Sequence, residues 1–377
     1  MQKHYLLFFL AIIIAFTGCK SNKQTSEEKS FAAKTVVIPL PQDKLYLPGH
    51  LKTMAPPTMY SEGGKDYMIG YNHKIHALDI FNVTDKTVEQ IPLEKEGPNG
   101  VNSLLNISYY KGAYLLGTTS RRYYLVNKEG KVMETYTFPA LEDVYAKEYN
   151  GIKSPWMIMN LFTFFTFNPQ KGEVAFAFYP KGMNEEPVKS PYLVEVYSFE
   201  TGEIEEIEIP YPQKMKQRTN WGFLNDLNIC LNGDLVIMNC PALSDVFVYN
   251  RKTKTLTEHA IPSRYIENIL HPVDMGGGDG EALPLRGFYY PLRYDPHRNV
   301  YWRMQAGEAD RPTSFDRTFS LIKISPDFSS YEEVLLPEDR EDTHSGLLIG
   351  ENGLWLNYAT ELAGEELWLF EIPLDVF

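Results

Sequence analysis

The sequence predicts an all-β fold, a six-bladed β-propeller in which a strand near the N-terminus completes the last blade. Three observations lead to this prediction: a repeated unit of strands, strongly apolar second strands, and a last unit that ends one strand short. The composition agrees, because 14% of the 377 residues are aromatic and 26 Gly and 25 Pro supply turns between short strands. No helical pattern of any length competes outside the first residues.

The repeat is clearest at the end of each unit, where an apolar strand, a turn and a more polar strand lead to a proline. Such segments occupy residues 77–93, 123–139, 192–211, 246–262 and 319–337. Each follows a compact apolar strand, and these begin at Tyr67, Ala113, Val174, Leu235 and Val300. Strands that are apolar on both faces are typical of sheets packed between neighbours, whereas polar strands suit an outer rim.

The sixth unit lacks its last strand. It has an apolar strand from Leu354 and the strand ELWLFEIPL, and then the chain ends. Residues 36–40, VVIPL, have the form of the missing unit end. A closed ring needs such a joint between the termini, because an open ring exposes two sheet edges. We therefore expect residues 35–377 to form one propeller domain, with a pair of β-sandwiches as the alternative.

The N-terminal segment predicts export. Lys3 and His4 precede an apolar run that is too short to span a bilayer comfortably, and Thr17-Gly18-Cys19 follows it. Small residues before a cysteine resemble the lipobox of bacterial lipoproteins, in which that cysteine becomes the lipidated first residue. We therefore interpret residues 1–18 as a lipoprotein signal peptide and Cys19 as the lipid anchor. An ordinary secretory signal or an uncleaved anchor is the alternative.

Residues 19–34 are predicted to be a flexible tether, because this polar and charged segment buries too little apolar area to offset the entropy of ordering. Glu27-Glu28 resembles the acidic export tags of lipoproteins on the outer leaflet. The expected location is the outer membrane, facing the periplasm or the cell exterior. The 49 acidic and 36 basic residues give a net charge of -13, which repels phosphate backbones and argues against a general nucleic-acid binder.

Two cysteines lie within the predicted propeller. If Asn232-Gly233 is a two-residue hairpin turn, Cys230 falls opposite Leu235, and Cys240 lies five residues further along that strand. The two thiols are then roughly 17 Å apart, beyond the reach of a disulfide. We expect both to be small buried hydrophobic residues.

The lengths of the turns predict a functional face. In a propeller, the turn between the second and third strands shares one face with the crossover to the next blade. Turns of the opposite face are short, such as Lys111-Gly112. The long segments all fall on the first face, and they are residues 141–163, 181–189, 213–225, 263–288 and 306–317. Long loops on a rigid scaffold usually carry binding sites, although loops that only cap the channel would have the same lengths.

Aromatic and basic residues on these segments and beside them are the candidate ligand contacts. Aromatic rings beside arginines can stack on sugars and hydrogen-bond hydroxyls and carboxylates. The candidates are Arg121, Arg122, Trp156, Arg218, Trp221, His271, Arg286, Tyr289 and Arg303. For each residue taken singly, rim packing or a surface salt bridge is the alternative interpretation.

The sequence predicts no catalytic residue and no cofactor. No GxSxG or HExxH motif occurs, and the glycine-rich residues 276–280 lack the Lys-Ser/Thr of a phosphate loop. The alternative is a metal-dependent hydrolase, lactonase or lyase with its site at the channel mouth. Weak metal-ligand candidates near strand starts are Asn102, Asn225, Asp226 and Asp274, and Ca²⁺ is the ion that such oxygen ligands would hold.

Four features together carry a resemblance to six-bladed propeller lipoproteins of Gram-negative bacteria. They are the lipobox, the acidic tether, the segment EGPNG at residues 96–100, and the hairpin from Tyr294-Asp295-Pro296 to residues 300–303, VYWR. The chain resembles the domain-of-unknown-function family four-two-two-one, in the TolB-like propeller group, over nearly all of the mature chain. The resemblance implies the fold and the location, and it supplies no activity and no catalytic residue.

The predicted function is therefore noncatalytic. We expect an outer-membrane-anchored binding or scaffold propeller, with its ligand on the long-loop face. The expected partners are the membrane, through the lipid anchor, and a glycan, a peptide or another envelope protein, but not nucleic acid.

Overall fold

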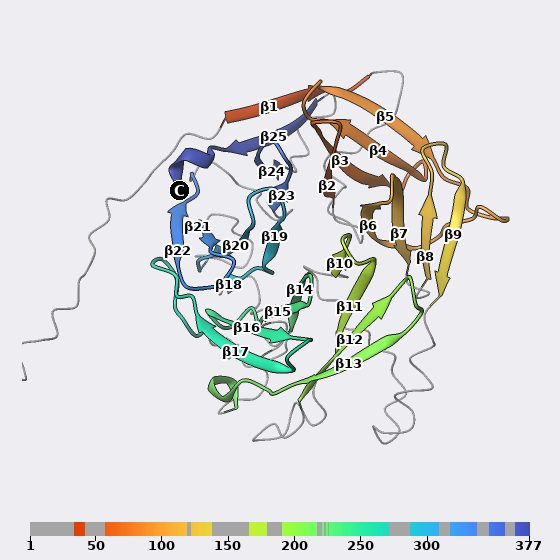
Figure 1. Cartoon of the computed structure of the whole chain (residues 1–377). Helices are drawn as coiled ribbons and strands as arrows, with labels where there is room; N and C mark the ends of the chain where they lie inside the picture. The colour runs from red at the N-terminus through yellow and green to blue at the C-terminus, as the bar shows by residue number, and fades with distance from the viewer. Residues whose placement is uncertain are drawn as a thin grey trace, which may run out of the picture.

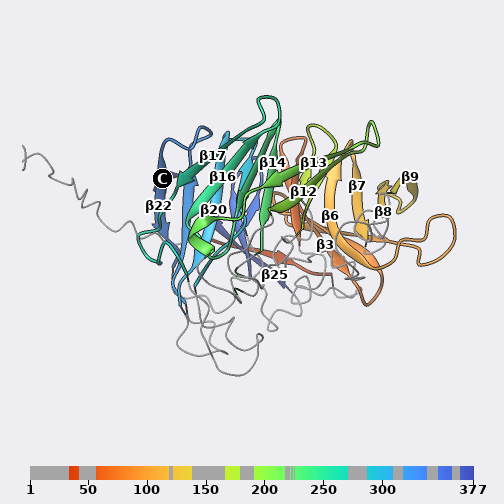
Figure 2. The same cartoon turned by 90° about the horizontal axis from the view of Figure 1, so that it is seen from below.

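The computed structural model is a ring of six antiparallel sheets around a central channel, as predicted (Figure 1). It describes residues 34–41, 57–118, 122–137, 166–178, 191–216, 221, 224, 226–270, 287–308, 317–337, 347–358 and 366–377. Figure 2 shows the blades from the side, where the strands of neighbouring sheets stand next to one another around the ring.

Each blade has its first strand at the channel and its last strand at the rim. Blade one contains β2 (Thr58–Glu62), β3 (Lys65–Asn72), β4 (Ala77–Asn82) and β5 (Thr87–Pro92). Blade two contains β6 (Leu104–Tyr110), β7 (Ala113–Thr118), β8 (Arg122–Val126) and β9 (Val132–Thr137). Blade three contains β10 (Thr166–Asn168), β11 (Glu173–Phe178), β12 (Tyr192–Ser198) and β13 (Ile204–Ile209).

The second half of the chain repeats this pattern, with one change in blade five. Blade four contains β14 (Asn228–Asn232), β15 (Leu235–Asn239), β16 (Asp245–Asn250) and β17 (Thr255–Ala260). Blade five contains β18 (Phe288–Tyr289), β19 (Arg293–Asp295), β20 (Val300–Ala306), β21 (Phe319–Ile324) and β22 (Tyr331–Leu335). Blade six contains β23 (Leu347–Ile349), β24 (Leu354–Tyr358), β25 (Glu366–Ile372) and β1 (Lys34–Pro39). Two short 3-10 turns, η2 (Gln213–Met215) and η5 (Leu374–Val376), complete the described secondary structure.

The burial of the strands follows their place in the blade. Every residue of β7 and of β20 is buried, because second strands are covered by the neighbouring blade on each face. On the rim strand β17, five of six residues are exposed. The short turns between first and second strands use residues that accept a positive φ, such as Lys111 and Gly112 with φ of 51° and 77°. The hydrophobic core therefore lies between the blades and leaves the centre of the ring open.

The N-terminal strand closes the ring, as predicted. β1 pairs antiparallel with β25, with Ile38 opposite Leu367, and the two strands lie side by side in Figure 1. Ile38 is fully buried among side chains of blades six and one. The carboxylate of Asp66 in blade one also accepts hydrogen bonds from the backbone N–H groups of Glu351 and Asn352 in blade six, at 2.8 and 2.9 Å. Two sets of bonds therefore close the ring: β1 pairs with β25 at the rim, and Asp66 of blade one bonds the turn between β23 and β24.

One register prediction was wrong. The hairpin between β14 and β15 pairs Asn232 with Leu235 and Cys230 with Ile237, so its two loop residues are Gly233 and Asp234. Gly233 has a φ of 56°, and glycine takes this angle without steric cost at the first loop position. The conclusion about the thiols is confirmed, because Cys230 and Cys240 are free and buried.

Residues 1–33 lie outside the described residues, and with them the predicted signal peptide, Cys19 and nearly all of the tether. Lys34, its last residue, already begins β1. In the described part of the chain, no helix is long and apolar enough to cross a membrane.

Candidate functional site

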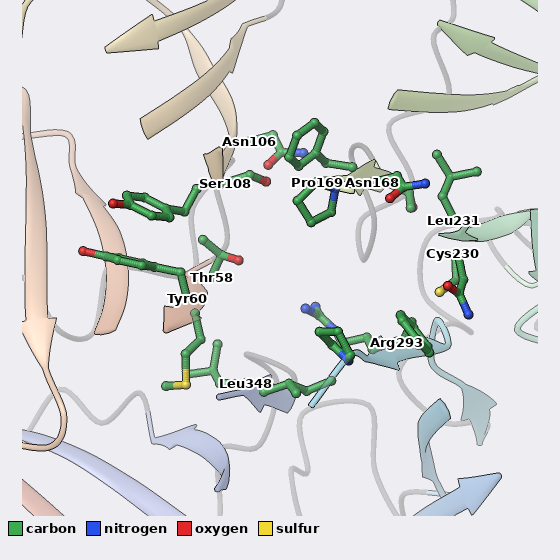
Figure 3. A pocket seen from close by; sticks show the side chains of 18 of the residues that line it. Thr58, Tyr60, Asn106, Ser108, Asn168, Pro169, Cys230, Leu231, Arg293 and Leu348 are labelled. Atoms are coloured by element: carbon green, nitrogen blue, oxygen red, sulfur yellow. The ribbon is translucent and has the colours of Figure 1, made fainter. Parts of the chain in front are cut away.

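A cavity of about 540 Å³ occupies the central channel. It is lined by residues of the inner strands β2, β6, β10, β14, β19 and β23 (Figure 3). Each inner strand pairs with the second strand of its own blade, so the backbone N–H and C=O groups of its other edge face the channel. One of them, at Tyr294, bonds the Cys230 thiol of the neighbouring blade, and those without a protein partner are available to water or a ligand. The volume lies within the range of small-molecule pockets, about 300–1,000 Å³.

The lining mixes apolar side chains with uncharged polar ones. Met59, Ile107, Leu231 and Leu348 supply apolar surface. Hydroxyl and amide groups come from Thr58, Ser61, Asn106, Ser108, Asn168, Gln170 and Asn232. Among the described residues, no Asp, Glu or Lys lines the cavity, and the basic side chains are those of Arg293 and His297. The channel of this acidic protein therefore carries no acidic group in its described wall.

Arg293 extends from β19 into the cavity (Figure 3). Its side chain is half-buried, and its guanidinium makes no hydrogen bond or ion pair with a described residue. Burial lowers the pKa of Arg293 from its ordinary value, and a guanidinium remains protonated in proteins. The channel thus holds one fixed positive charge that no described carboxylate neutralises.

A bulge in the inner strand of blade five precedes Arg293. Tyr289 pairs with Gln305, and Arg293 pairs with Trp302. Between these two pairs the chain advances by four residues on the inner strand but by only three on β20, so the inner strand contains one extra residue. Pro291 lies in the interruption, and proline has no N–H for the ladder. Since one extra residue reverses which side of a strand the following side chains face, the bulge sets the direction of Arg293.

Cys230 is the neighbour of Arg293 in blade four. The last paired residues before the turns of the two hairpins are Asn232–Leu235 in blade four and Asp295–Val300 in blade five. Cys230 and Arg293 each lie two residues before that last pair, so they occupy equivalent positions. Burial raises the pKa of the Cys230 thiol to about 12, and a hydrogen bond from the Tyr294 backbone and the charge of Arg293 oppose this rise. At neutral pH Cys230 is therefore a neutral thiol and leaves the charge of Arg293 uncompensated.

Tyrosine rings make one wall of the channel rigid. Tyr60 stacks on Tyr67 and on Tyr109, with ring centroids 4.9 and 3.9 Å apart. The Tyr109 hydroxyl donates a 2.6 Å hydrogen bond to Glu62. Figure 3 shows that the ring of Tyr60 points away from the cavity, between blades one and two. These rings support the wall, and their faces are occupied by one another.

A buried carboxylate holds the hairpin that carries Arg293. Asp295 accepts hydrogen bonds from Arg298 Nη1 at 2.7 Å and from Trp302 Nε1 at 2.9 Å. Arg298 also donates to the carbonyls of Gly350 and Glu351 in blade six, at 3.1 and 3.2 Å. This cluster fixes the hairpin of blade five against the next blade, so the backbone that carries Arg293 is held in place.

Two predicted ligand contacts meet in the interior. Tyr289 and Arg303 are fully buried, and the guanidinium lies 4.6 Å from the centre of the tyrosine ring. Arg303 donates to the carbonyls of Ser244 and Ile261, at 2.8 and 2.5 Å, and burial lowers its pKa to about 10. The Tyr289 hydroxyl donates to the Glu267 carbonyl. Both side chains therefore pack blade five against blade four and present no open face.

Trp221 and Arg122 lie apart from that pair. Trp221 is buried in the core cluster that includes Met215, and its Nε1 donates to the Met215 carbonyl at 3.1 Å. Arg122 is exposed at the start of β8. The other ligand-binding candidates, Arg121, Trp156, Arg218, His271 and Arg286, lie outside the described residues, as do most residues of the long segments.

The metal-ligand candidates show no cluster in the described structure. Asp226 is buried, and Asn102 is exposed and donates to the carbonyl of Lys95. Asn225 and Asp274 lie outside the described residues. Within the described ranges, no group of three His, Cys, Asp or Glu side chains is placed to hold a metal ion.

Sequence reasoning missed Arg293. The signal was present, because the first strand of each unit must line the channel once the ring is closed. An arginine on that strand in blade five, where Cys230 and Ser108 occupy the corresponding positions, marks the channel as a charged site. The bulge that sets its direction depends on the pairing with β20 and is not visible in the sequence alone.

Comparison with known proteins agrees with this architecture. The family described as Domain of unknown function (DUF4221) matches residues 21–333. The crystal structure of a DUF4221 member from Bacteroides vulgatus has a TM-score of 0.66 at 18% identity and covers 91% of this chain and 97% of that chain.

Two further solved structures are less similar. A luciferin-regenerating enzyme has a TM-score of 0.45 at 10% identity, with 91% and 96% of the two chains covered. A regucalcin from Agrobacterium tumefaciens, described as a calcium-binding protein, has a TM-score of 0.42 at 10% identity, with 84% and 88% covered. No curated protein matches the sequence. Because the family profile covers most of the chain and a solved member shares its propeller, this protein belongs to the DUF4221 family.

Proposed function

We propose that this protein is a noncatalytic binding propeller whose ligand occupies the central channel. The observation that carries the proposal is the cavity of about 540 Å³, which is lined by edge strands and by mixed apolar, hydroxyl and amide side chains. Such a lining supplies surface for the apolar faces of a small ligand and hydrogen bonds for its polar groups. Because six bonded blades hold the walls, the cavity is already formed before a ligand enters.

The chemistry of the described lining favours binding over hydrolysis. A hydrolase needs a general base, a nucleophile with a base beside it, or a set of metal ligands. The described lining contains no carboxylate, its thiol, Cys230, is protonated at neutral pH, and its one histidine, His297, lies in the exposed turn between β19 and β20. Metal-dependent hydrolysis, the alternative predicted from the sequence, therefore gains no support from the described wall.

The proposal includes the location predicted from the sequence. A lipid on Cys19 would hold the propeller at the outer membrane, and residues 20–33 reach at most about 50 Å when fully extended. This length lets the propeller turn so that its channel meets a soluble small molecule, a glycan or a peptide. Fractionation of cells that express the wild type or Cys19→Ser tests the location. Wild type should partition with the outer membrane, and the variant should not.

The binding proposal is tested by blocking the channel. Thermal unfolding of the purified full-length protein is measured against a panel of sugars, sugar acids and short peptides. Each compound that raises the melting temperature is then tested on Thr58→Trp, which places an indole in the channel lining, and on Thr87→Trp, an exposed position of the rim strand β5. We expect Thr58→Trp to abolish the shift and Thr87→Trp to retain it.

Two outcomes would contradict the proposal. A shift that survives in Thr58→Trp would move the ligand out of the channel, for example to the long-loop face. Conversion of a bound compound to a product, with loss of the conversion after treatment with EDTA, would establish the metal-dependent alternative instead.

A further inference from the structure

Resting on the proposed binding function, we propose that Arg293 anchors a carboxylate group in the channel, and that the ligand is a small monocarboxylic acid bearing hydroxyl groups, such as a sugar acid. Arg293 differs from two other arginines of the ring, which have carboxylate partners. Arg251 is paired with Glu173 and Glu205, and Arg298 with Asp295. Arg293 makes no hydrogen bond or ion pair with any described residue, although the cavity wall surrounds it.

An unpaired charge in such a place opposes folding. Removing a charged group from bulk water costs free energy, and a paired partner normally offsets that cost. At a channel position that only fills space, an apolar side chain would be more stable. Instead, the chain carries a bulge beside Pro291 and places the guanidinium in the cavity. We therefore infer that the partner of Arg293 is the ligand.

The charge of the channel selects the kind of anion. A guanidinium offers a planar pair of N–H donors that matches a carboxylate or a phosphate. The described lining has one permanently charged side chain, Arg293, and no lysine to share a second negative charge. A carboxylate is neutralised by that single charge, whereas a phosphate monoester, with a charge near -2 at pH 7, keeps an uncompensated charge inside the channel. The channel therefore favours the monoanion.

The surface charge of the protein does not cancel this preference. The net charge of -13 is spread over the whole chain, and salt screens exposed charges beyond about 8 Å at physiological ionic strength. Arg293 acts at contact distance from a ligand in the channel, and its side chain is half-buried, so the charge interaction there is stronger than in bulk water. The local charge therefore decides which ions bind in the channel.

The remaining lining describes the rest of the ligand. The hydroxyls of Thr58 and Ser108 line the cavity and make no hydrogen bond to a described residue. The unpaired edges of the inner strands add backbone donors and acceptors. Leu231 and Leu348 supply apolar surface beside these groups. A ring with several hydroxyls and one carboxylate uses all three features.

The test compares three compounds that differ in one substituent. The melting temperature of the full-length protein is measured in D-glucuronate, glucose 6-phosphate and glucose, with ionic strength matched by sodium chloride, and acetate serves as the minimal carboxylate. We expect acetate and glucuronate to raise the melting temperature, with glucuronate effective at lower concentration. Glucose 6-phosphate and glucose should give smaller shifts.

Two variants of Arg293 distinguish the effect of its positive charge from that of its paired N–H donors. Arg293→Met should abolish the shift caused by the carboxylates and raise the melting temperature of the ligand-free protein. Arg293→Lys keeps the charge without the paired donors, and its dissociation constant for glucuronate should rise at least about tenfold. Arg298→Met is the matched control. Arg298 lies on the same hairpin, and its guanidinium hydrogen-bonds to groups of the protein. This control variant should lower the melting temperature and retain the shift.

The outcomes separate this inference from the proposed function. If neither acetate nor glucuronate shifts the wild type, or if both shift Arg293→Met equally, the carboxylate site is overturned. If a neutral compound binds and Thr58→Trp blocks it while Arg293→Met does not, the channel binds a ligand and only the role of Arg293 is wrong. If glucose 6-phosphate binds more tightly than glucuronate, the preference for a monoanion is overturned.

Discussion

Arg293 and Arg298 lie five residues apart on one hairpin and have opposite surroundings. Arg298 bonds to a buried carboxylate and to two carbonyls of the next blade. Arg293 extends into the channel and has no described partner. We infer that the two charges serve different purposes. A charge that holds blades together is neutralised within the fold, whereas a charge meant for a ligand stays available.

Two further arginines between blades also bond to groups of the fold. Arg251 bonds to Glu173 and Glu205, and it joins blade four to blade three. Arg303 bonds to two backbone carbonyls and lies over the ring of Tyr289. Arg251 and Arg303 thus bond to groups of neighbouring blades, whereas Arg293 makes no hydrogen bond or ion pair with a described residue.

Removal of Asp295 should have the largest effect. Asp295→Ala removes a fully buried carboxylate that accepts from Arg298 and from the Trp302 indole N–H. We expect the free energy of unfolding to fall by about 3–5 kcal/mol, as measured by chemical denaturation. Asp295→Asn keeps one acceptor oxygen and should lose less. Wild-type stability of Asp295→Ala would show that this cluster does not hold the hairpin.

Removal of Arg298 should have a smaller effect in the same direction. Arg298→Met takes the donors away from two carbonyls of blade six and leaves Asp295 with fewer partners. We expect the free energy of unfolding to fall by about 1–3 kcal/mol. Denaturation of Arg298→Met in combination with Asp295→Ala measures the coupling between the two residues. Fully additive losses would contradict the described contact.

Removal of Arg293 should raise the free energy of unfolding, whereas removal of Asp295 or Arg298 lowers it. Arg293→Met replaces an unpaired, partly desolvated charge by a shorter, unbranched apolar side chain. We expect the free energy of unfolding in the absence of ligand to rise by about 1 kcal/mol. The measurement is urea denaturation of Arg293→Met and Arg298→Met under the same conditions, each compared with the wild type. If both variants lose stability to the same extent, the contrast between the two arginines fails.

Loss of the two ion pairs that Asp234 makes at the turns should have the smallest effect. Lys171 and Lys252 lower the pKa of the Asp234 carboxyl to about 2. The value in the unfolded chain is about 3.9, so the ionised carboxylate stabilises the folded state above that pH and ceases to do so as pH falls toward 2. The difference in melting temperature between wild type and Asp234→Asn should be small above about pH 4 and disappear near pH 2. If the melting temperatures of wild type and Asp234→Asn diverge further as pH falls, the ionised Asp234 does not stabilise the folded state in this way.

Local patterns in the sequence were enough to predict the architecture. The repeated unit ends, the apolar second strands and the missing last strand led to six blades and to closure by β1, because a ring cannot leave sheet edges exposed. These features are local patterns of hydrophobicity repeated along the chain, and each blade satisfies the same pattern. The export signal and lipid anchor remain predictions from the same kind of local pattern.

Which polar side chains face the channel and which face a neighbouring blade depends on tertiary contacts. Tyr289 and Arg303 were expected at a ligand, and they pack between blades instead. Arg293 was not singled out, and it extends into the cavity. The physical reason is that strand direction, register and a single bulge residue choose the side to which each side chain points. Those choices come from pairing with strands that are distant in the sequence, and composition and spacing do not encode them.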